Sequence, residues 1–268
     1  MRRRRLWGLA IGWGLLLLGF AVWVRNPITP ERVMVPLYRY PGAVWLQVET
    51  GAPTVQMTIV NPASGPGRRP DSRFALAVQA LERKFLVLGY VATDYGKIPI
   101  STVMRQITAY FDWYHVNGIF LDNTTTSCQA GGPITYYGAV SRTIRQKWPQ
   151  ATIVMNPGTI PGACYASQAS ILVTYEGPWK GYSQYRPQAW MLSDHASQFA
   201  NLISRLPGQD VARAAKIAWE RHAGWLYLTN RGGRGADNAY DRLPSYFNAE
   251  VRAVHQLPWG FLTDLWHR

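Results

Sequence analysis

The stretch ISTVMRQITAYFDWYHVNGIFLDN, residues 100–123, decides the fold. Its first part, Ile100–Trp113, repeats apolar residues at helical spacing, which predicts an amphipathic α-helix. Its second part, Val116–Asn123, is an almost continuous apolar run of strand length that ends on the polar pair Asp122 and Asn123. A strand this apolar is typical of a parallel sheet that is covered on both faces. The stretch therefore predicts a helix followed by a buried parallel strand with a carboxylate at its carboxyl end.

The same alternation of helix and strand patterns extends over most of the chain. Further strands are predicted at Val33–Tyr40, Thr54–Asn61, Phe85–Ala92, Thr152–Asn156, Ser170–Glu176, Phe199–Leu206 and Trp225–Thr229. Further helices are predicted at Asp71–Lys84, Ile134–Trp148, Asp210–Ala223 and Tyr246–His255, with weaker helical segments after the first, fifth and sixth strands. Eight strand–helix units in about 240 residues indicate an α/β fold, a closed (β/α)8 TIM-type barrel.

An open doubly wound sheet is the alternative architecture for this pattern. The first predicted strand is followed by Tyr40-Pro41-Gly42-Ala43, which is not the glycine-rich phosphate-binding fingerprint of a dinucleotide fold. The closed barrel is therefore the preferred prediction.

The N-terminus predicts a transmembrane signal-anchor helix. Arg2–Arg5 form a positive segment, and Leu6–Val24 are 19 residues without a charge, enough to span a bilayer core. The bulky residues at the end of this run favour an uncleaved anchor over a cleaved signal peptide. The arginines should hold the N-terminus in the cytoplasm, which places the rest outside it, in the periplasm or at the cell surface, or secreted if the signal is cleaved. The predicted segments are 1–25 (signal-anchor), 26–31 (linker) and 32–268 (barrel with a C-terminal closing segment, Pro258–Arg268).

Composition and charge limit the classes of partner. The chain has 28 Lys and Arg against 15 Asp and Glu, a net charge of +13, which attracts anionic partners. There is no basic helix, zinc finger or RNA-binding signature, so we expect no nucleic-acid partner. The five histidines are dispersed, and Ser64 does not lie in a nucleophile elbow. We expect no metal, no cofactor and a monomer.

The predicted active site lies at the carboxyl ends of the barrel strands. Asp122 and Glu176 each end an apolar strand, where a charge is costly to desolvate unless it is used or paired. A salt bridge or a helix N-cap at the barrel end is the alternative role for either residue. The two strands are second neighbours, so their ends lie roughly 10 Å apart, and inward-leaning side chains reach the roughly 5–9 Å that glycoside hydrolysis requires of its two carboxylates. Substrate-binding residues are predicted at the other polar strand ends: Tyr38, Asn61, Asp94, Tyr95, Asn123, Asn156 and Thr229.

The two cysteines fall on neighbouring loops of the same barrel end. Cys128 follows the fourth predicted strand and Cys164 follows the fifth. In an exported protein this placement favours a disulfide over two unpaired buried thiols. Such a bond would pin the rim of the site.

Several segments at the strand ends resemble the spherulin-4 (spherulation-specific family 4) proteins. They are Val35-Pro36-Leu37-Tyr38, residues 59–67 (IVNPASGPG), Leu88-Gly89-Tyr90-Val91, Gly118–Asp122, Asn156-Pro157-Gly158-Thr159, Val173–Glu176 and Leu243–Phe247. The resemblance covers residues from about Val33 to Val254. It implies a (β/α)8 fold similar to barrel glycoside hydrolases that cut α-linked N-acetylgalactosamine polymers of microbial extracellular matrix. It also implies a role directed at an extracellular or envelope polysaccharide.

The resemblance assigns roles to three positions. In those hydrolases an Asp-Glu pair ends the fourth strand and a Glu ends the sixth, so Asp122 and Glu176 match the first and last positions. The middle position departs, because Asn123 cannot donate or accept a proton as a catalytic acid does. We therefore expect a glycoside hydrolase with Asp122 and Glu176 as catalytic carboxylates, and a non-catalytic carbohydrate-binding envelope protein as the alternative. A third interpretation, a basic surface protein that binds nucleic acid or anionic lipid, rests on charge alone. The positive charge favours an acidic or neutral glycan over a cationic one.

Overall fold

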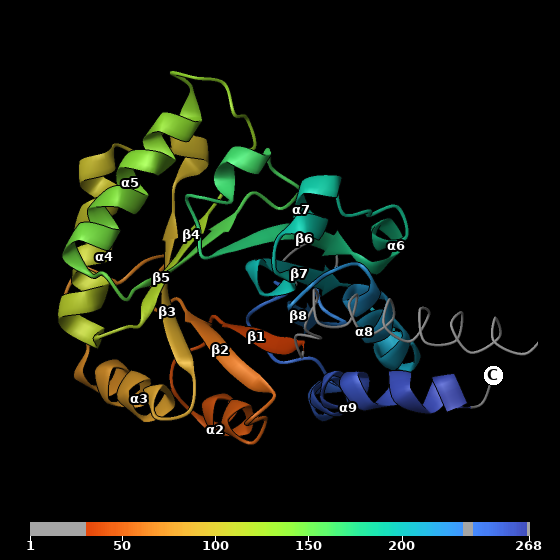
Figure 1. The fold of residues 1–268 in the computed structure, drawn as a ribbon. Coiled ribbons are helices and arrows are strands. Elements are labelled where there is room, and N and C mark those ends of the chain that lie inside the picture. The colour runs from red at the N-terminus through yellow and green to blue at the C-terminus, as the bar shows by residue number, and fades with distance from the viewer. Residues whose placement is uncertain (1–30, 233–237, 267–268) are drawn as a thin grey trace, which may run out of the picture.

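The predicted TIM-type barrel is confirmed in a computed structural model of the chain (Figure 1). The structure describes residues 31–232 and 238–266, the last nine of these by their backbone alone. Within these residues, eight parallel strands close into a barrel in the order β1-β2-β3-β4-β5-β6-β7-β8. The strands are β1 (Arg32–Leu37), β2 (Val55–Val60), β3 (Leu86–Ala92), β4 (Gly118–Asp122), β5 (Thr152–Asn156), β6 (Ile171–Pro178), β7 (Phe199–Ser204) and β8 (Trp225–Leu228).

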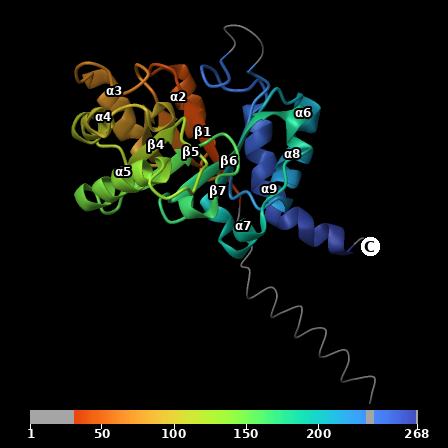
Figure 2. The ribbon, with the colours of Figure 1, turned by 90° about the horizontal axis from the view of Figure 1, so that it is seen from above.

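Each predicted strand overlaps an observed one. The apolar runs are buried almost throughout, because side chains fill the inside of the barrel. Helices cover its outside (Figures 1 and 2). The main difference is β6, which continues two residues beyond Glu176 to Pro178. Its pairing with β7 shifts register between Val173 and Tyr175. Such irregularities re-aim the side chains that follow them, and here they precede a candidate catalytic residue.

Helices connect most of the strands. They are α2 (Ala43–Glu49), α3 (Ser72–Glu82), α4 (Ile100–Tyr114), α5 (Pro133–Lys147), α6 (Trp179–Tyr182), α7 (Ala189–Ser193), α8 (Val211–Glu220) and α9 (Phe247–Trp266). Short 3-10 turns lie at η1 (Asp94–Gly96), η2 (Ala163–Tyr165), η3 (Ala196–Gln198) and η4 (Gly208–Asp210). After β5 the structure has the turn η2 in place of the weak helix that the sequence predicts. The prolines and glycines Pro157, Gly158, Pro161 and Gly162 interrupt helical geometry there.

Helix α4 packs directly on strand β3. A Cβ atom on Gly89 would lie 2.4 Å from the ring of Tyr110, so only glycine permits this approach. Tyr110 is fully buried, and its hydroxyl donates a hydrogen bond of 3.3 Å to the carbonyl oxygen of Val60. The contact fixes the β3–α4 unit and the loop that carries Asp94 and Tyr95.

The structure describes most of the C-terminal end of the chain but not its N-terminal segment. The predicted signal-anchor of residues 1–25 lies outside the described residues. At the other end, α9 runs on to Trp266 and so includes most of the predicted closing segment Pro258–Arg268. Among the described helices, none combines the length and the apolar character that crossing a bilayer requires.

Candidate active site at the carboxyl ends of the strands

Asp122 is positioned by the regular register of the central strands. The Cα partners Ala92, Asp122 and Asn156 lie side by side on β3, β4 and β5. The carboxylate of Asp122 accepts two hydrogen bonds: its Oδ2 from the Tyr90 hydroxyl at 2.8 Å and its Oδ1 from the Asn156 amide at 2.8 Å. A donor to each oxygen suits the acceptor-only ionised carboxylate.

Glu176 approaches the same point from β6. Its backbone N–H donates to the carbonyl oxygen of Gly158 at 3.0 Å, which ties the end of β6 to the loop after β5. Its Oε2 accepts a hydrogen bond of 2.5 Å from the Asn156 amide. Its Oε1 accepts a hydrogen bond from the hydroxyl of Tyr240, which arrives from the loop between β8 and α9. Two separate parts of the chain therefore hold this carboxyl group, and a third bond holds the backbone of Glu176.

Asn156 joins the two carboxylates. Its side chain is 4% exposed, and its Oδ1 accepts the backbone N–H of Gly158 at 2.9 Å. That bond fixes the orientation of the amide, so that the NH2 group faces Asp122 and Glu176. Because Nδ2 lies 2.8 Å from Asp122 Oδ1 and 2.5 Å from Glu176 Oε2, these two oxygens are separated by no more than the sum of the two distances, about 5.3 Å. The predicted carboxylates thus converge.

The two carboxyl groups have different electrostatic surroundings. Burial raises the pKa of Glu176 above its usual range, hydrogen bonds from Tyr240 and Asn156 lower it, and the negative charge of Asp122 raises it. Burial has the largest effect, so Glu176 holds its proton to a higher pH than an ordinary glutamate. A carboxyl that keeps its proton to a higher pH than usual, beside a second carboxyl, is suited to general acid catalysis.

Three tyrosines surround the carboxylates. The Tyr38 ring packs edge-on against Tyr90 at 5.3 Å and against Tyr240 at 5.5 Å between ring centroids. Burial, and after it the charge of the neighbouring carboxylates, raises the pKa of all three hydroxyls. They therefore remain protonated at neutral pH and act as hydrogen-bond donors.

Tyr90 and Tyr240 were not predicted as site residues. Tyr90 lies two residues before the end of β3, on the same face of the strand as Ala92, which pairs with Asp122. Applying the two-residue period of the strand to the predicted end would have identified it. Tyr240 lies in a loop without strand or helix periodicity, and nothing in the sequence pattern places it over β6.

Asn123 adopts a left-handed backbone conformation directly after Asp122, with φ of 52°. Asn tolerates this region better than most residues do. Its carbonyl oxygen accepts hydrogen bonds from the Thr93 hydroxyl at 2.8 Å and from the backbone N–H of Tyr95 at 2.7 Å. The Thr93 hydroxyl also donates to the carbonyl of Asp122 at 2.9 Å. The backbone beneath the catalytic candidate is therefore held from the β3–α4 loop.

Asp94 and Tyr95 lie on the rim beside Asn123. Both have positive φ, 44° and 55°, which costs roughly 1–2 kcal/mol per residue for side chains other than glycine. Asp94 forms a surface ion pair with Lys97 at 3.7 Å. Tyr95 is 53% exposed. A strained turn that holds an aromatic ring out at the rim suits contact with a sugar face.

Asn61 and Thr229 have bonds to the backbone at their strand ends. The Asn61 Oδ1 accepts the N–H of Gly65 at 2.9 Å and shapes the loop after β2. The Thr229 hydroxyl is 1% exposed and accepts the N–H of Arg231 at 3.1 Å. Within the part of the chain that the structure describes, neither side chain bonds to Asp122 or Glu176, so both shape the loops around the site.

The disulfide between Cys128 and Cys164 that the sequence predicts is present, with 5.8 Å between the two Cα atoms. It links the loop after β4 to the loop after β5. A Cβ atom on Gly162 would lie 2.3 Å from the sulfur of Cys128, so a larger residue at this position would displace the bond. The backbone N–H of Gly162 donates to the carbonyl of Thr126 at 2.9 Å, which joins the same two loops a second time.

The site has no grouping suited to a metal ion. Across residues 31–232 and 238–266, no three His, Cys, Asp or Glu side chains come together as metal ligands would. Asp122 and Glu176 both accept hydrogen bonds from the side-chain NH2 group of Asn156. Proton transfer and hydrogen bonding are the chemistry that these residues can perform by themselves.

Solved structures place this arrangement among known barrels. The structure is similar to Aspergillus clavatus Sph3 in complex with GalNAc, with a TM-score of 0.73 and 25% identity over 85% of this chain and 98% of that one. It is also similar to active domain 2 of a thermostable chitinase from Pyrococcus furiosus, with a TM-score of 0.55 and 10% identity over 88% of this chain and 97% of that one. At that identity the second likeness shows the fold alone.

Sequence comparisons identify the family. A model of spherulation-specific family 4 matches residues 32–254. Spherulin-4 of Physarum polycephalum is 30% identical over 241 residues, which cover 85% of this chain and 71% of the relative. The matched region begins with the first residue of β1 and reaches into α9, so it includes every strand described above. The chain belongs to spherulation-specific family 4.

Proposed function

We propose that this chain is a glycoside hydrolase that cleaves an N-acetylgalactosamine-containing polysaccharide outside the cytoplasm. The observation that carries the proposal is the convergence of Asp122 and Glu176 on the amide of Asn156. The two bridged oxygens are at most about 5.3 Å apart, closer than the roughly 6.5–9.5 Å between the carboxyls of inverting glycosidases, which supports a retaining mechanism. The choice of sugar is supported by the likeness to Sph3, whose structure contains GalNAc.

The environments of the two carboxyls assign their roles. Glu176, with its raised pKa, donates its proton to the glycosidic oxygen as the bond from that oxygen to the anomeric carbon breaks. Asp122, held by Tyr90 and Asn156, supplies the electron pair that bonds to the anomeric carbon from the opposite face. Glu176, now ionised, removes a proton from water. The resulting oxygen nucleophile attacks the anomeric carbon, breaks the bond to Asp122 and leaves the sugar with its original configuration.

Asn123 has no proton-transfer step in this scheme. The family resemblance places a glutamate there, but the two carboxylates that the reaction needs are Asp122 and Glu176. Asn123 lies beside Asp122, where its amide can bind a hydroxyl or acetamido group of the substrate. Tyr95, on the adjacent rim, offers an aromatic face to the sugar ring.

Release of new reducing ends tests hydrolysis directly. The full-length chain in a non-ionic detergent is incubated with an α-linked N-acetylgalactosamine polymer and, separately, with an acidic envelope polysaccharide. Glu176→Gln is the matched control, since it keeps the size of the side chain and removes its proton. We expect reducing ends from the wild type in excess of those from the variant. Equal release on every polymer would exclude hydrolysis.

A carbohydrate-binding protein without turnover is the second candidate. The observation that favours it is Asn123, which leaves the end of β4 with one carboxylate where the related hydrolases have two. This alternative requires that the chain retain the glycan in a pull-down, that Asp122→Asn retain it equally, and that the wild type release no product. Turnover that disappears in Asp122→Asn would reject it.

The predicted anchor also sets the orientation of the active site relative to the membrane. Strand β1 begins at Arg32, so the chain enters the barrel at the amino ends of the strands, opposite Asp122 and Glu176. We propose that residues 6–24 hold the protein at a membrane with the catalytic end pointing away from it, toward the polysaccharide. Protease added to intact cells should digest the barrel and leave an N-terminal fragment in the membrane. A barrel that is protected in intact cells and digested only after lysis would contradict this placement.

A further inference from the structure

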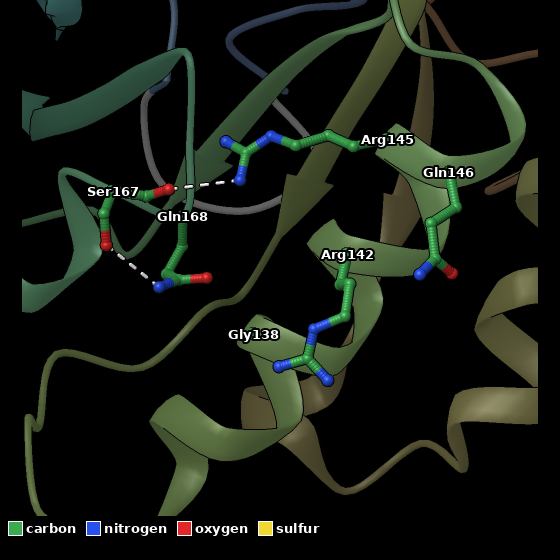
Figure 3. Close-up of a pocket in the computed structure, with 6 residues that line it drawn as sticks. All are labelled: Gly138, Arg142, Arg145, Gln146, Ser167 and Gln168. Atoms are coloured by element: carbon green, nitrogen blue, oxygen red, sulfur yellow. Dashed lines mark hydrogen bonds between the residues drawn. The ribbon is translucent and has the colours of Figure 1, made fainter.

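A groove on the outer wall of the barrel lies apart from the carboxylates. It has a volume of about 360 Å³ and is lined by Gly138, Arg142, Arg145, Gln146, Ser167 and Gln168. The first four lie on α5, and the other two face them from the segment between η2 and β6 (Figure 3). Ser167 and Gln168 come just before β6 begins at Ile171, toward the amino ends of the strands, whereas Glu176 lies toward the opposite end.

The groove is positively charged and has no internal counter-charge. Neither α5 nor the segment of residues 157–170 contains an acidic residue. Arg145 donates a hydrogen bond of 3.1 Å to the carbonyl oxygen of Ser167. Within the described residues, the guanidinium of Arg142 has neither a hydrogen-bond nor an ion-pair partner. Two like charges three residues apart on a helix repel each other unless an anion lies between them.

The helix dipole stabilises only some of these positive charges. Arg145 and Lys147 lie in the last turn of α5, where cations are stabilised by the partial negative charge of the helix C-terminus. Arg142 lies before that turn and gains little from it, because the effect declines within one turn. Arg142 is exposed to solvent, so its guanidinium is free to bind an anion.

Gly138 keeps the groove open. A glycine inside a helix lowers its stability relative to alanine, so a structural reason for it is expected. A Cβ atom there would meet Gln168 Oε1 at 3.5 Å, an ordinary contact distance. The packing of α5 therefore does not require glycine at this position. Glycine instead leaves a gap of about one carbon atom between the helix and Gln168, so a ligand would lie over this gap rather than within it.

The wall opposite α5 is held in place. Gln168 donates to the Ser167 hydroxyl at 2.9 Å, and this hydroxyl donates to the carbonyl oxygen of Cys164 at 3.2 Å. Cys164 is fixed by its disulfide to Cys128. This wall of the groove is thus in place before any ligand arrives, which lowers the entropic cost of binding.

We propose that this groove is a second glycan-binding site, specific for a sugar that carries an oxyanion, either a carboxylate or a phosphate. The planar guanidinium groups of Arg142 and Arg145 suit the oxygens of such a group. The amides of Gln146 and Gln168 supply donors and acceptors for the sugar hydroxyls. The site would keep an acidic polysaccharide on the protein while the barrel end acts on it or on a neighbouring chain.

Calorimetric titration of the full-length chain in a non-ionic detergent tests the proposal. The probes are trigalacturonate, glucose 6-phosphate and a neutral N-acetylgalactosamine trimer. Arg142→Gln with Arg145→Gln should weaken binding of at least one of the two anionic probes by about tenfold or more, and the probe affected identifies the anionic group. Gly138→Val, which narrows the groove without changing its charge, should weaken the same probe. The neutral trimer should bind equally to all variants.

The control removes two positive charges elsewhere. Arg83→Gln with Arg252→Gln changes two exposed arginines outside the groove and should leave the affinities within about twofold of wild type. An equal loss in this control would show a general charge effect and overturn the site. No binding of either anionic sugar, or binding only to phosphatidylglycerol vesicles, would also overturn it. Glu176→Gln tests the hydrolase separately, so the two proposals fail independently.

Discussion

The carboxyl ends of β4 and β6 each present a carboxylate, but the chain builds the two ends differently. At β4 the strands pair in regular register, and Asp122 receives its hydrogen bonds from β3 and β5. At β6 the register shifts before Glu176, and one of the two bonds to its carboxyl comes from Tyr240, sixty-four residues further along the chain. Glu176 is also the residue whose pKa is raised by burial.

This difference supports the separate roles that we propose for these two similar side chains. A carboxylate that accepts hydrogen bonds from neighbouring strand ends is suited to act as a charged nucleophile. A buried carboxyl that accepts a hydrogen bond from a tyrosine is suited to donate a proton. Substitutions at one end at a time distinguish the two roles.

Removing the charge at the end of β4 should have the largest effect. In Asp122→Asn the side chain keeps one hydrogen-bonded oxygen but is no longer a nucleophile. Turnover should therefore fall by about a thousandfold or more, as for other catalytic nucleophiles. The loss should be similar for the polysaccharide and for an aryl N-acetylgalactosaminide with a good leaving group, since both need the nucleophile. Initial rates on both substrates measure it. A loss confined to the polysaccharide would assign Asp122 the role of the acid.

Removing the proton at the end of β6 should have an effect that depends on the substrate. In Glu176→Gln, cleavage of the polysaccharide should slow by about 10²- to 10⁴-fold, the usual contribution of general acid catalysis. Formation of the glycosyl-enzyme from the aryl substrate should slow much less, because its leaving group needs no proton. The burst of released phenol in stopped-flow kinetics measures this step. Equal losses on both substrates would contradict the assignment.

Tyr240→Phe tests how the hydroxyl of Tyr240 affects Glu176 at the end of β6. The Tyr240 hydroxyl stabilises the charged form of Glu176 and lowers its pKa, so its removal should raise that pKa further. The alkaline limb of the rate profile reports loss of the acid proton, and it should therefore move to higher pH. Turnover should fall by about tenfold for the lost hydrogen bond to a charged group. Tyr136→Phe, which removes a hydroxyl bonded to the carbonyl of Ile98, is the control and should leave the limb in place.

Asn123→Glu should have a smaller effect. It introduces the family's acidic residue beside Asp122, at a position with positive φ that Glu tolerates less well than Asn. Because the reaction is assigned to Asp122 and Glu176 alone, turnover should stay within about threefold of wild type after correction for folded protein. Steady-state kinetics measure it. A gain of a hundredfold would show that the missing carboxylate limits this enzyme.

The disulfide should affect stability far more than turnover. The bond spans 36 residues of sequence, and replacing both cysteines with serine should lower the free energy of unfolding by about 2–4 kcal/mol. Turnover at a temperature where the variant is folded should be nearly unchanged, because the carboxylates are held by Asn156 and Tyr240. Denaturant titration and initial rates separate the two quantities. A large loss of turnover in the folded variant would show that the loops position the substrate.

The parts of the molecule that repeat were predictable from the sequence, and the parts that depend on irregular segments were not. Continuous apolar runs gave all eight strands, and the strand-end rule gave Asp122, Glu176 and Asn156. The fifth connection was predicted as a weak helix, whereas Pro157 and Pro161 restrict it to a short turn. Tyr240 could not be predicted, since its place over Glu176 depends on the path of a loop. The roles of Asn61 and Thr229 in the loops depend on backbone partners that periodicity does not reveal.

The configuration of the first product tests the central claim, that Asp122 and Glu176 form a retaining pair. Proton NMR during the first minutes of cleavage of an α-linked N-acetylgalactosamine oligomer would record the anomer before mutarotation. The separation of at most about 5.3 Å between the bridged oxygens predicts that the α-anomer forms first. Initial formation of the β-anomer would require a water molecule between the carboxylates and would contradict the mechanism.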